Sequence, residues 1–110
     1  MFKIHLNRII LIGQVCEKPI LRYVPSGTPV CTFSIEVWRE NLDSSIQDEE
    51  RDIFPIVAWK EQALFCHQSI EKGGWVYCEG SLHIRSFEEK ASQRKAEVEV
   101  ILKDIFCLQQ

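Results

Sequence analysis

The alternation of apolar and polar residues from Val30 to Trp38 constrains the fold of this chain more than any other segment. The apolar residues fall on one side of an extended chain: Cys31, Phe33, Ile35 and Val37. The polar side carries Thr32, Ser34, Glu36 and Trp38. A period of two predicts a β-strand that buries one face. The chain therefore contains a half-buried strand, and the indole of Trp38 lies on its polar face.

Similar patterns occur along the rest of the chain. The segments that predict further extended structure are Arg8–Cys16, Ile20–Val24, Ile53–Trp59, Trp75–Phe87 and Ala96–Lys103. Gly13 allows the first segment to bend, and Pro19 separates it from its continuation at Ile20. Ile53–Trp59 is apolar on both faces, as a central strand would be. In the last two segments, the residues expected to point inward are Val76, Cys78, Leu82, Val98, Val100 and Leu102.

One segment predicts a helix. In Lys60–Lys72, the apolar residues Ala63, Cys66 and Ile70 share one helical face, and Gly73 stands where a C-terminal cap belongs. The connections are a proline turn, an acidic loop and a charged hairpin: Pro25–Pro29, Asn41–Asp52 and Glu88–Lys95.

The order strand, strand, strand, helix, strand, strand, with a kinked first strand, is that of a five-stranded oligonucleotide/oligosaccharide-binding (OB) barrel. Other small β-barrels have similar spacing, so the pattern alone leaves them open. We expect an all-β protein with one short helix, and residues 1–110 as a single OB domain.

Composition limits the partners and the compartment. The net charge is −3, but Glu36–Asp52 holds seven acids and two bases, which leaves nine acids and eleven bases elsewhere. That distribution permits a polyanion partner. Five cysteines without close pairs favour free thiols in a reducing compartment. No apolar run is long enough to span a membrane and no signal peptide is recognisable, so we expect a cytoplasmic protein without a membrane partner.

The segment from Arg85 to Lys95 has the chemistry of a single-stranded nucleic-acid site. Phe87 offers a ring for base stacking, and cations that can follow phosphates flank it: Arg85, Lys90, Arg94 and Lys95. Arg22, next to Tyr23 on a strand, is a further candidate. The alternative is a solvated hairpin with one exposed phenylalanine.

The tryptophans allow more than one interpretation. Trp38 suggests a binding surface, although a partner subunit or the following loop is an alternative cover. For Trp59, core packing is the default expectation. Trp75 and Tyr77 share a face, which favours a contact between subunits.

Metal and catalytic sites are not indicated. The cysteines and histidines lack the short paired spacing of zinc ligands, and Cys31 and Cys78 have the parity of core residues. Cys66 and His67 are neighbours on a helix and do not face each other. We expect neither an enzyme nor a bound cofactor.

Motifs along the chain resemble bacterial single-stranded DNA-binding protein (SSB). The matching residues in the first half are Asn7–Val15, Pro19, Leu21–Tyr23, Pro25–Val30 and Phe33. Those in the second half are Val57–Trp59, Ala63, Lys72–Gly73, Val76–Tyr77, Glu79–Gly80, Leu82 and Arg85–Glu88. A related family, primosomal replication protein N (PriB), is similar at Asn7–Arg8, Gly13, Val15–Cys16, Pro25–Gly27, Pro29, Cys31, Phe33, Ile35–Glu36, Pro55–Val57, Ser69–Ile70 and Gly73.

The resemblance to SSB implies that Trp59 and Phe87 stack on bases. Ile53 stands where that family often has a third ring, Lys60 replaces a usual glycine, and Leu64 replaces a usual glutamate. The sequence ends at Gln110 without the long acidic-tipped tail of SSB, which favours PriB and argues against a role in recruiting partners.

The function expected from the sequence is binding of single-stranded DNA in bacterial replication or replication restart. The nucleic-acid-binding residues are expected to be Arg22, Trp38, Trp59, Arg85, Phe87, Lys90, Arg94 and Lys95. The expected assembly is a homodimer or homotetramer, and a replication-restart helicase or other primosome proteins are possible partners. The alternatives are a protein-interaction OB module that docks through Trp38, Trp75 and Tyr77, and a binder of structured RNA.

Overall fold

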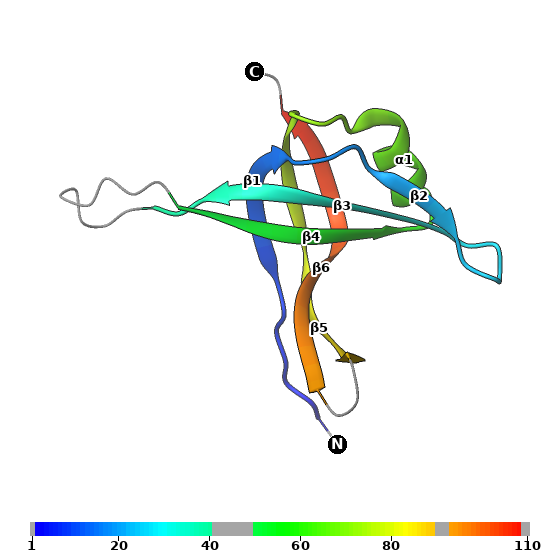
Figure 1. Ribbon diagram of the computed structural model, residues 1–110, viewed down its shortest axis with the longest axis vertical. Helices are drawn as coiled ribbons and strands as arrows, with labels where there is room; N and C mark the ends of the chain where they lie inside the picture. Colours follow the sequence, from blue (N-terminus) through cyan, green and yellow to red (C-terminus); the bar gives the residue numbers. More distant parts are fainter. Residues whose placement is uncertain (1, 41–49, 90–92, 109–110) are drawn as a thin grey trace.

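The computed structural model describes the backbone of residues 2–40, 50–89 and 93–108, and side chains in these ranges except those of 87–89 and 93–94. Within them the chain forms six strands and one helix (Figure 1). The elements are β1 (Ile9–Val15), β2 (Ile20–Tyr23), β3 (Pro29–Trp38), β4 (Arg51–Trp59), α1 (Glu61–Ser69), β5 (Trp75–Glu89) and β6 (Gln93–Leu108). The predicted order of elements is confirmed except that Ile20–Tyr23, expected to continue the first strand, is a separate strand that pairs with β3.

Five of the strands close into a ring in the order β1-β5-β6-β4-β3, because β3 also pairs with β1. The β1–β3 contact joins Gln14 to Glu36 and Val15 to Ile35. Gly13 lies just before this contact, and a Cβ atom there would be 2.4 Å from the carbonyl oxygen of Glu36. The close approach explains why glycine stands at the predicted bend of β1. The sixth strand, β2, pairs with β3.

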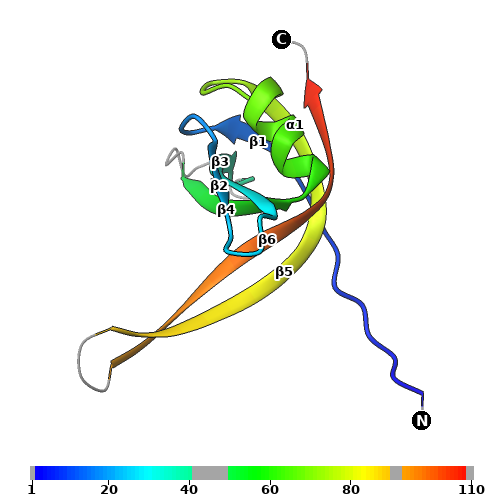
Figure 2. The ribbon, with the colours of Figure 1, turned by 90° about the vertical axis from the view of Figure 1, so that its right-hand side faces the viewer.

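The core lies inside the ring and under helix α1. Cys31, Phe33 and Ile35 of β3 are buried, as their alternation predicted. Helix α1 packs against β2, β3 and β4, and covers one end of the ring with the predicted face of Ala63 and Cys66 (Figure 2). No helix among the described residues is long and apolar enough to cross a membrane.

The helix is shorter than predicted and Gly73 is not its cap. It ends at Ser69, because Ile70 adopts an extended conformation and turns its side chain into the core. Gly73 instead forms the following turn with φ +86°, where its N–H donates a 2.8 Å hydrogen bond to the carbonyl of Val15. Glycine tolerates this left-handed conformation better than other residues.

β5 and β6 continue beyond the ring as a two-stranded arm (Figures 1 and 2). Their register shifts between Glu79 and Gly80, and after that point the two strands run far past β1 and β4. The predictions that Leu82 and Val98 point into the core are therefore wrong: Leu82 is 38% and Val98 47% exposed. The expected hairpin Glu88–Lys95 is also too long, since β5 reaches Glu89 and β6 begins at Gln93.

Candidate nucleic-acid interface

The outer face of β2, β3 and β4 carries two of the three predicted aromatic positions. Because Cys31, Phe33 and Ile35 point inward, Trp38 points outward from β3, opposite Arg51 of β4. Trp59 lies on the same outer face near the other end of β4. Trp38 is 45% and Trp59 40% exposed. The default expectation of core packing is therefore wrong for Trp59, and the outward position of Trp38 is confirmed.

Arg22 lies in the same cross-strand row as Trp59. Arg22 pairs with Val30, and Val30 pairs with Trp59. Arg22 is exposed and lies two strands from Trp59, with Val30 of β3 between them. The row places a possible phosphate contact beside a possible stacking ring.

Trp38 has a cationic neighbour that the sequence analysis missed. The guanidinium carbon of Arg51 is 5.0 Å from the centroid of the Trp38 ring, within the range of a cation–π contact. Arg51 Nη1 also donates a hydrogen bond of 3.2 Å to the carboxylate of Glu36. Arg51 could have been recognised as a neighbour of Trp38 only from its position opposite Trp38 on β4. The sequence does not reveal that register.

A second arginine at this end is held by carboxylates. Arg39 donates to Asp52 at 2.8 Å and also forms an ion pair with Glu50. The hydrogen bond from Arg39 lowers the pKa of Asp52, and the same bond raises the pKa of Arg39. The cations of this hairpin are thus largely neutralised within the chain.

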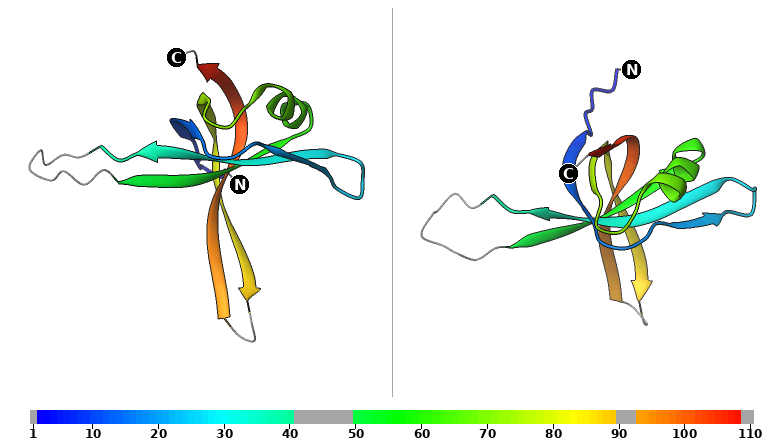
Figure 3. Two further views of the ribbon diagram at one scale, coloured as in Figure 1. Left: turned by 45° about the horizontal axis from the view of Figure 1, so that its top comes forward. Right: turned by 90° about the horizontal axis from the view of Figure 1, so that it is seen from above.

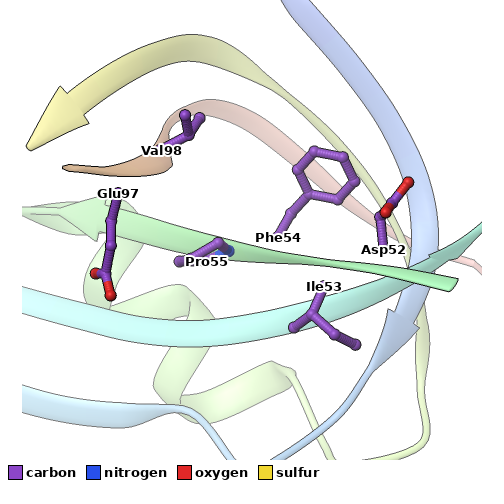
Figure 4. A pocket seen from close by; sticks show the side chains of 6 residues that line it. All are labelled: Asp52, Ile53, Phe54, Pro55, Glu97 and Val98. Carbon is purple, nitrogen blue, oxygen red and sulfur yellow. The ribbon is translucent and has the colours of Figure 1, made fainter. Parts of the chain in front are cut away.

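A groove of about 430 Å³ separates the first half of β4 from β6 (Figure 4). Its lining residues are Asp52, Ile53, Phe54, Pro55, Glu97 and Val98. Pro55 has no N–H to donate, and the pairing of the two strands begins at Ile56 opposite Val100. Ile53, at the position of a missing family ring, is half exposed beside the groove. The groove is mainly apolar with a carboxylate at each end.

The arm of β5 and β6 reaches this groove through Glu97. Arg85 Nη2 forms a 3.3 Å ion pair with Glu97, which lines the groove. Lys95 is exposed and lies opposite Phe87 in the strand register. The side chains of Phe87 and Arg94, and Lys90 as a whole, lie outside the described residues. Arg85 thus lies beside the groove through Glu97, whereas Trp38 and the row of Arg22 and Trp59 lie at opposite ends of the β3–β4 pairing. Figure 3 shows that the arm of β5 and β6 runs across the direction of β3 and β4.

Trp75 and Tyr77 lie on a different surface, the outer face of β1, β5 and β6. Ile12, Tyr77 and Phe106 form a cross-strand row there, and the rings of Tyr77 and Phe106 are 5.7 Å apart. Ile12 and Phe106 are exposed. These residues are well placed for a contact with another protein surface and are separate from the β2–β3–β4 face.

The thiols have the character of core groups. Burial raises the pKa of Cys66 and of Cys78 to about 12, and also raises the pKa of Cys31. In the part of the chain that the structure describes, no group of three or more His, Cys, Asp or Glu residues could hold a metal ion.

A closed ring of five strands with one short helix and an aromatic outer sheet face defines the class: an OB fold with a candidate nucleic-acid interface. The predicted fold class is confirmed by a solved structure, the Plasmodium falciparum SSB complex with ssDNA. Its TM-score is 0.88 at 31% sequence identity, and the match covers 99% of this chain and 100% of that chain. A model of the single-strand binding protein family matches residues 6–108. The chain belongs to this family.

Curated relatives agree with this assignment. The chain is 34% identical over 104 residues to the single-stranded DNA-binding protein of Caldanaerobacter subterraneus subsp. tengcongensis, with 94% of this chain and 69% of that protein covered. It is 33% identical to single-stranded DNA-binding protein A of Bacillus subtilis, with 94% of this chain and 60% of that protein covered. The chain thus spans roughly two thirds of the length of these relatives.

Proposed function

We propose that this chain binds single-stranded DNA across the outer face of β2, β3 and β4. The observation that carries the proposal is the pair of exposed indoles on that face. Arg51 lies against the ring of Trp38, and Arg22 shares a cross-strand row with Trp59, across Val30. Rings that stack on bases beside cations that meet phosphates bind single strands without sequence preference. Family membership and the likeness to an SSB bound to ssDNA support the same function.

The two indoles set the length of the path. Trp38 is opposite Arg51, and Trp59 is eight residues further along β4, a distance of about 26 Å at the ordinary rise of a strand. At about 3.4 Å per nucleotide, the duplex spacing of one strand, this path corresponds to about eight nucleotides, and to fewer when the strand is stretched. Such a length agrees with the roughly 4–16 nucleotides that an OB fold contacts.

The arm of β5 and β6 extends the proposed path. Arg85 and Lys95 supply cations there, and Phe87, Lys90 and Arg94 complete the set by their sequence positions. We further propose a homodimer or homotetramer that joins through the outer face of β1, β5 and β6, and a role in bacterial replication or replication restart beside primosome proteins. The exposed apolar side chains of Ile12 and Phe106 support the assembly.

Tryptophan fluorescence tests the proposal directly. Oligo-dT should quench the emission of the intact protein, and added salt should reverse the quenching because phosphate contacts release counterions. Trp38→Ala and Trp59→Ala should each weaken binding by about 1–3 kcal/mol. Phe65→Ala is the matched control, because Phe65 is a comparably exposed ring on helix α1. The absence of both quenching and a mobility shift at low salt would refute the proposal.

A protein-interaction module is the second candidate, favoured by one observation. Arg39 and Arg51 are both held by carboxylates, which reduces the attraction of the β3–β4 hairpin for a polyanion. Replacing Arg22, Arg85 and Lys95 together by alanine separates the two functions. If the triple variant loses DNA binding and keeps replication activity, protein interaction is the main role. Competition with structured RNA tests the remaining alternative.

A further inference from the structure

The groove between β4 and β6 lies on the proposed DNA path, between the two indoles. Ile53 at the rim of the groove is two residues along β4 from Arg51, the residue opposite Trp38. Trp59 is six residues further along the same strand. At the ordinary rise of a strand, these separations are about 7 Å and about 20 Å. A single strand that stacks on both indoles therefore passes over the groove.

The groove has an apolar floor and a polar rim. Phe54 has the parity of the buried Ile56, and Val98 has that of the buried Val100. Both side chains therefore lie toward the inside of the ring, whereas Glu97 has the opposite parity and points to the outer face (Figure 4). The volume of about 430 Å³ lies within the range of small-ligand pockets, roughly 300–1,000 Å³.

The two carboxylates of the groove differ in what they can still accept. Both oxygens of Asp52 are engaged by Arg39, with Nε at 3.0 Å from Oδ2 and Nη2 at 2.8 Å from Oδ1. Glu97 accepts from Arg85 through Oε2 alone, and no hydrogen bond from the described part of the chain reaches its Oε1. The side chain of Glu97 is 54% exposed. Glu97 Oε1 is therefore the acceptor that this groove offers to a ligand.

The ion pairs also allow a polyanion to approach these carboxylates. Arg39 balances the charge of Asp52, and Arg85 balances that of Glu97. Each pair leaves little net negative charge at its end of the groove, so the repulsion of a passing phosphate is reduced. The hydrogen-bonding capacity of Glu97 remains, because one arginine contact occupies one of its two oxygens.

A lone acceptor at the rim distinguishes the two pyrimidine bases of DNA. Cytosine presents an N4 amino group, which donates to a carboxylate, whereas thymine presents the O4 carbonyl at the same position of the ring. Opposite Glu97, the O4 atom of thymine would place two acceptors against each other and leave both without a donor. Such a mismatch costs more than a good contact gains, since desolvated acceptors lose their water without replacement.

We propose that the groove receives one base of the bound strand and that Glu97 selects cytosine over thymine there. Glu97 Oε1 accepts the N4–H of the base, and the apolar floor of Phe54 and Val98 covers part of the ring. Arg85 is a positioning residue that holds the carboxylate at the rim. The inference rests on the proposed function and deepens it: stacking makes the path tolerant of sequence, and the groove adds a base preference at one step.

Titrations with oligo-dC and oligo-dU of eight nucleotides, followed by tryptophan fluorescence at slightly alkaline pH, test the proposal. Uracil lacks the methyl group of thymine, so the two strands differ only in the hydrogen-bonding edge of the base. The unmodified chain should bind oligo-dC at least about fivefold more tightly. Equal affinities, with quenching by both strands, overturn the proposal and leave the proposed function intact. The absence of quenching by either strand overturns both.

A pair of variants with the same change in charge assigns the preference to Glu97. Glu97→Gln should bring the ratio of the two affinities close to one, because an amide can donate to the O4 of uracil as well as accept from cytosine. Glu99→Gln is the control: it lies on the same face of β6, opposite His83 and outside the groove, and should keep the ratio. The ratio cancels the general effect of a lost negative charge. A ratio that Glu97→Gln leaves unchanged contradicts the proposal.

The variant Val98→Phe tests whether the base enters the groove. The larger side chain fills the apolar floor and leaves the pair of Arg85 and Glu97 in place. The preference for oligo-dC should be lost, the affinity for oligo-dU should be nearly unchanged, and circular dichroism should show the same fold. A preference that survives in this variant would mean that the base stays outside the groove, which overturns the proposal.

A single cytosine moved along oligo-dU of eight nucleotides locates the step. One position should carry most of the gain in affinity, because the groove lies at a fixed distance from Trp38 along β4. In Glu97→Gln the same scan should be flat. An equal gain from every position in the unmodified chain contradicts a single base site.

Discussion

The guanidinium carbon of Arg51 lies 5.0 Å from the centre of the Trp38 ring while its Nη1 atom donates to the carboxylate of Glu36 at 3.2 Å. One arginine thus joins a stacking ring to an anion on the proposed DNA face. The charge available to a phosphate near Trp38 therefore depends on Glu36, which both repels the strand and competes for Arg51.

The variant Glu36→Gln should bind single-stranded DNA several-fold more tightly at low salt. The change removes one negative charge and frees Arg51 to meet a phosphate, so the salt slope should steepen by about 0.7 for the one added contact. Fluorescence titrations with oligo-dT at several salt concentrations measure both quantities. Glu17→Gln is the control, because it makes the same change in charge at a carboxylate that lies 4.0 Å from the ammonium of Lys72, whereas Arg51 pairs with Glu36. Weaker binding by Glu36→Gln would argue that Glu36 orients Arg51 for the DNA.

The separation of Trp38 and Trp59 predicts a dependence on oligonucleotide length. A strand too short for the path of about 26 Å engages one indole at a time, whereas a longer strand engages both. Quenching and affinity should therefore rise steeply up to about eight nucleotides and then level off for a single site. In Trp59→Ala, the affinity that short strands gain at Trp38 should remain, and the further gain of strands long enough to reach both rings should be lost. A smooth, length-independent affinity per nucleotide would contradict a path with two fixed rings.

The variant Lys60→Gly should be more stable than the unmodified chain by about 1 kcal/mol. Lys60 has φ 60° and ψ −127°, a conformation that costs residues with a side chain roughly 1–3 kcal/mol, while glycine adopts it readily. The hydrogen bond from the Lys60 N–H to the Pro29 carbonyl is retained. Urea denaturation measures the gain. Lys18→Gly is the control, since Lys18 has no positive φ and glycine there should slightly destabilise the chain.

The thiols should react with an alkylating reagent in a fixed order. Cys107 is exposed and should react first, whereas Cys66 and Cys78, with pKa values of about 12, hold only a minute fraction of thiolate at neutral pH. Burial raises the pKa of these two thiols in the folded state, so their contribution to the free energy of unfolding is fully present below the thiol pKa of the unfolded chain. This contribution is lost as the pH rises from about 9 toward 12. Mass spectrometry after timed labelling shows the order. Early modification of Cys66 would contradict the described core.

Local patterns predicted the fold where one strand or helix decided the outcome. The alternation of β3 assigned Ile35 to the core and Trp38 to the surface, and the helical face of Ala63 and Cys66 was also assigned correctly. Each of these assignments depends on a period that neighbouring residues define.

The errors have a common origin in tertiary structure. Val98 keeps the same period as Val100, but β6 has left the ring at Val98, so burial ends although the pattern continues. Trp59 follows three buried residues, so parity alone could not assign its face. Arg51 acquires its role from a residue thirteen positions earlier, through a register that the hairpin establishes.

The parallel seam of β4 and β6 has a consequence for how the protein acquires its structure. The seam joins residues more than forty positions apart, Ile56 to Val100 and Val57 to Ile101. The chain must lose the entropy of a long loop before this contact forms, and topologies dominated by such contacts fold in milliseconds to seconds. We expect the hairpins to form early and the seam late. We expect the same short seam to open first in the native protein. Rapid amide exchange there would show that the ring opens transiently between β4 and β6.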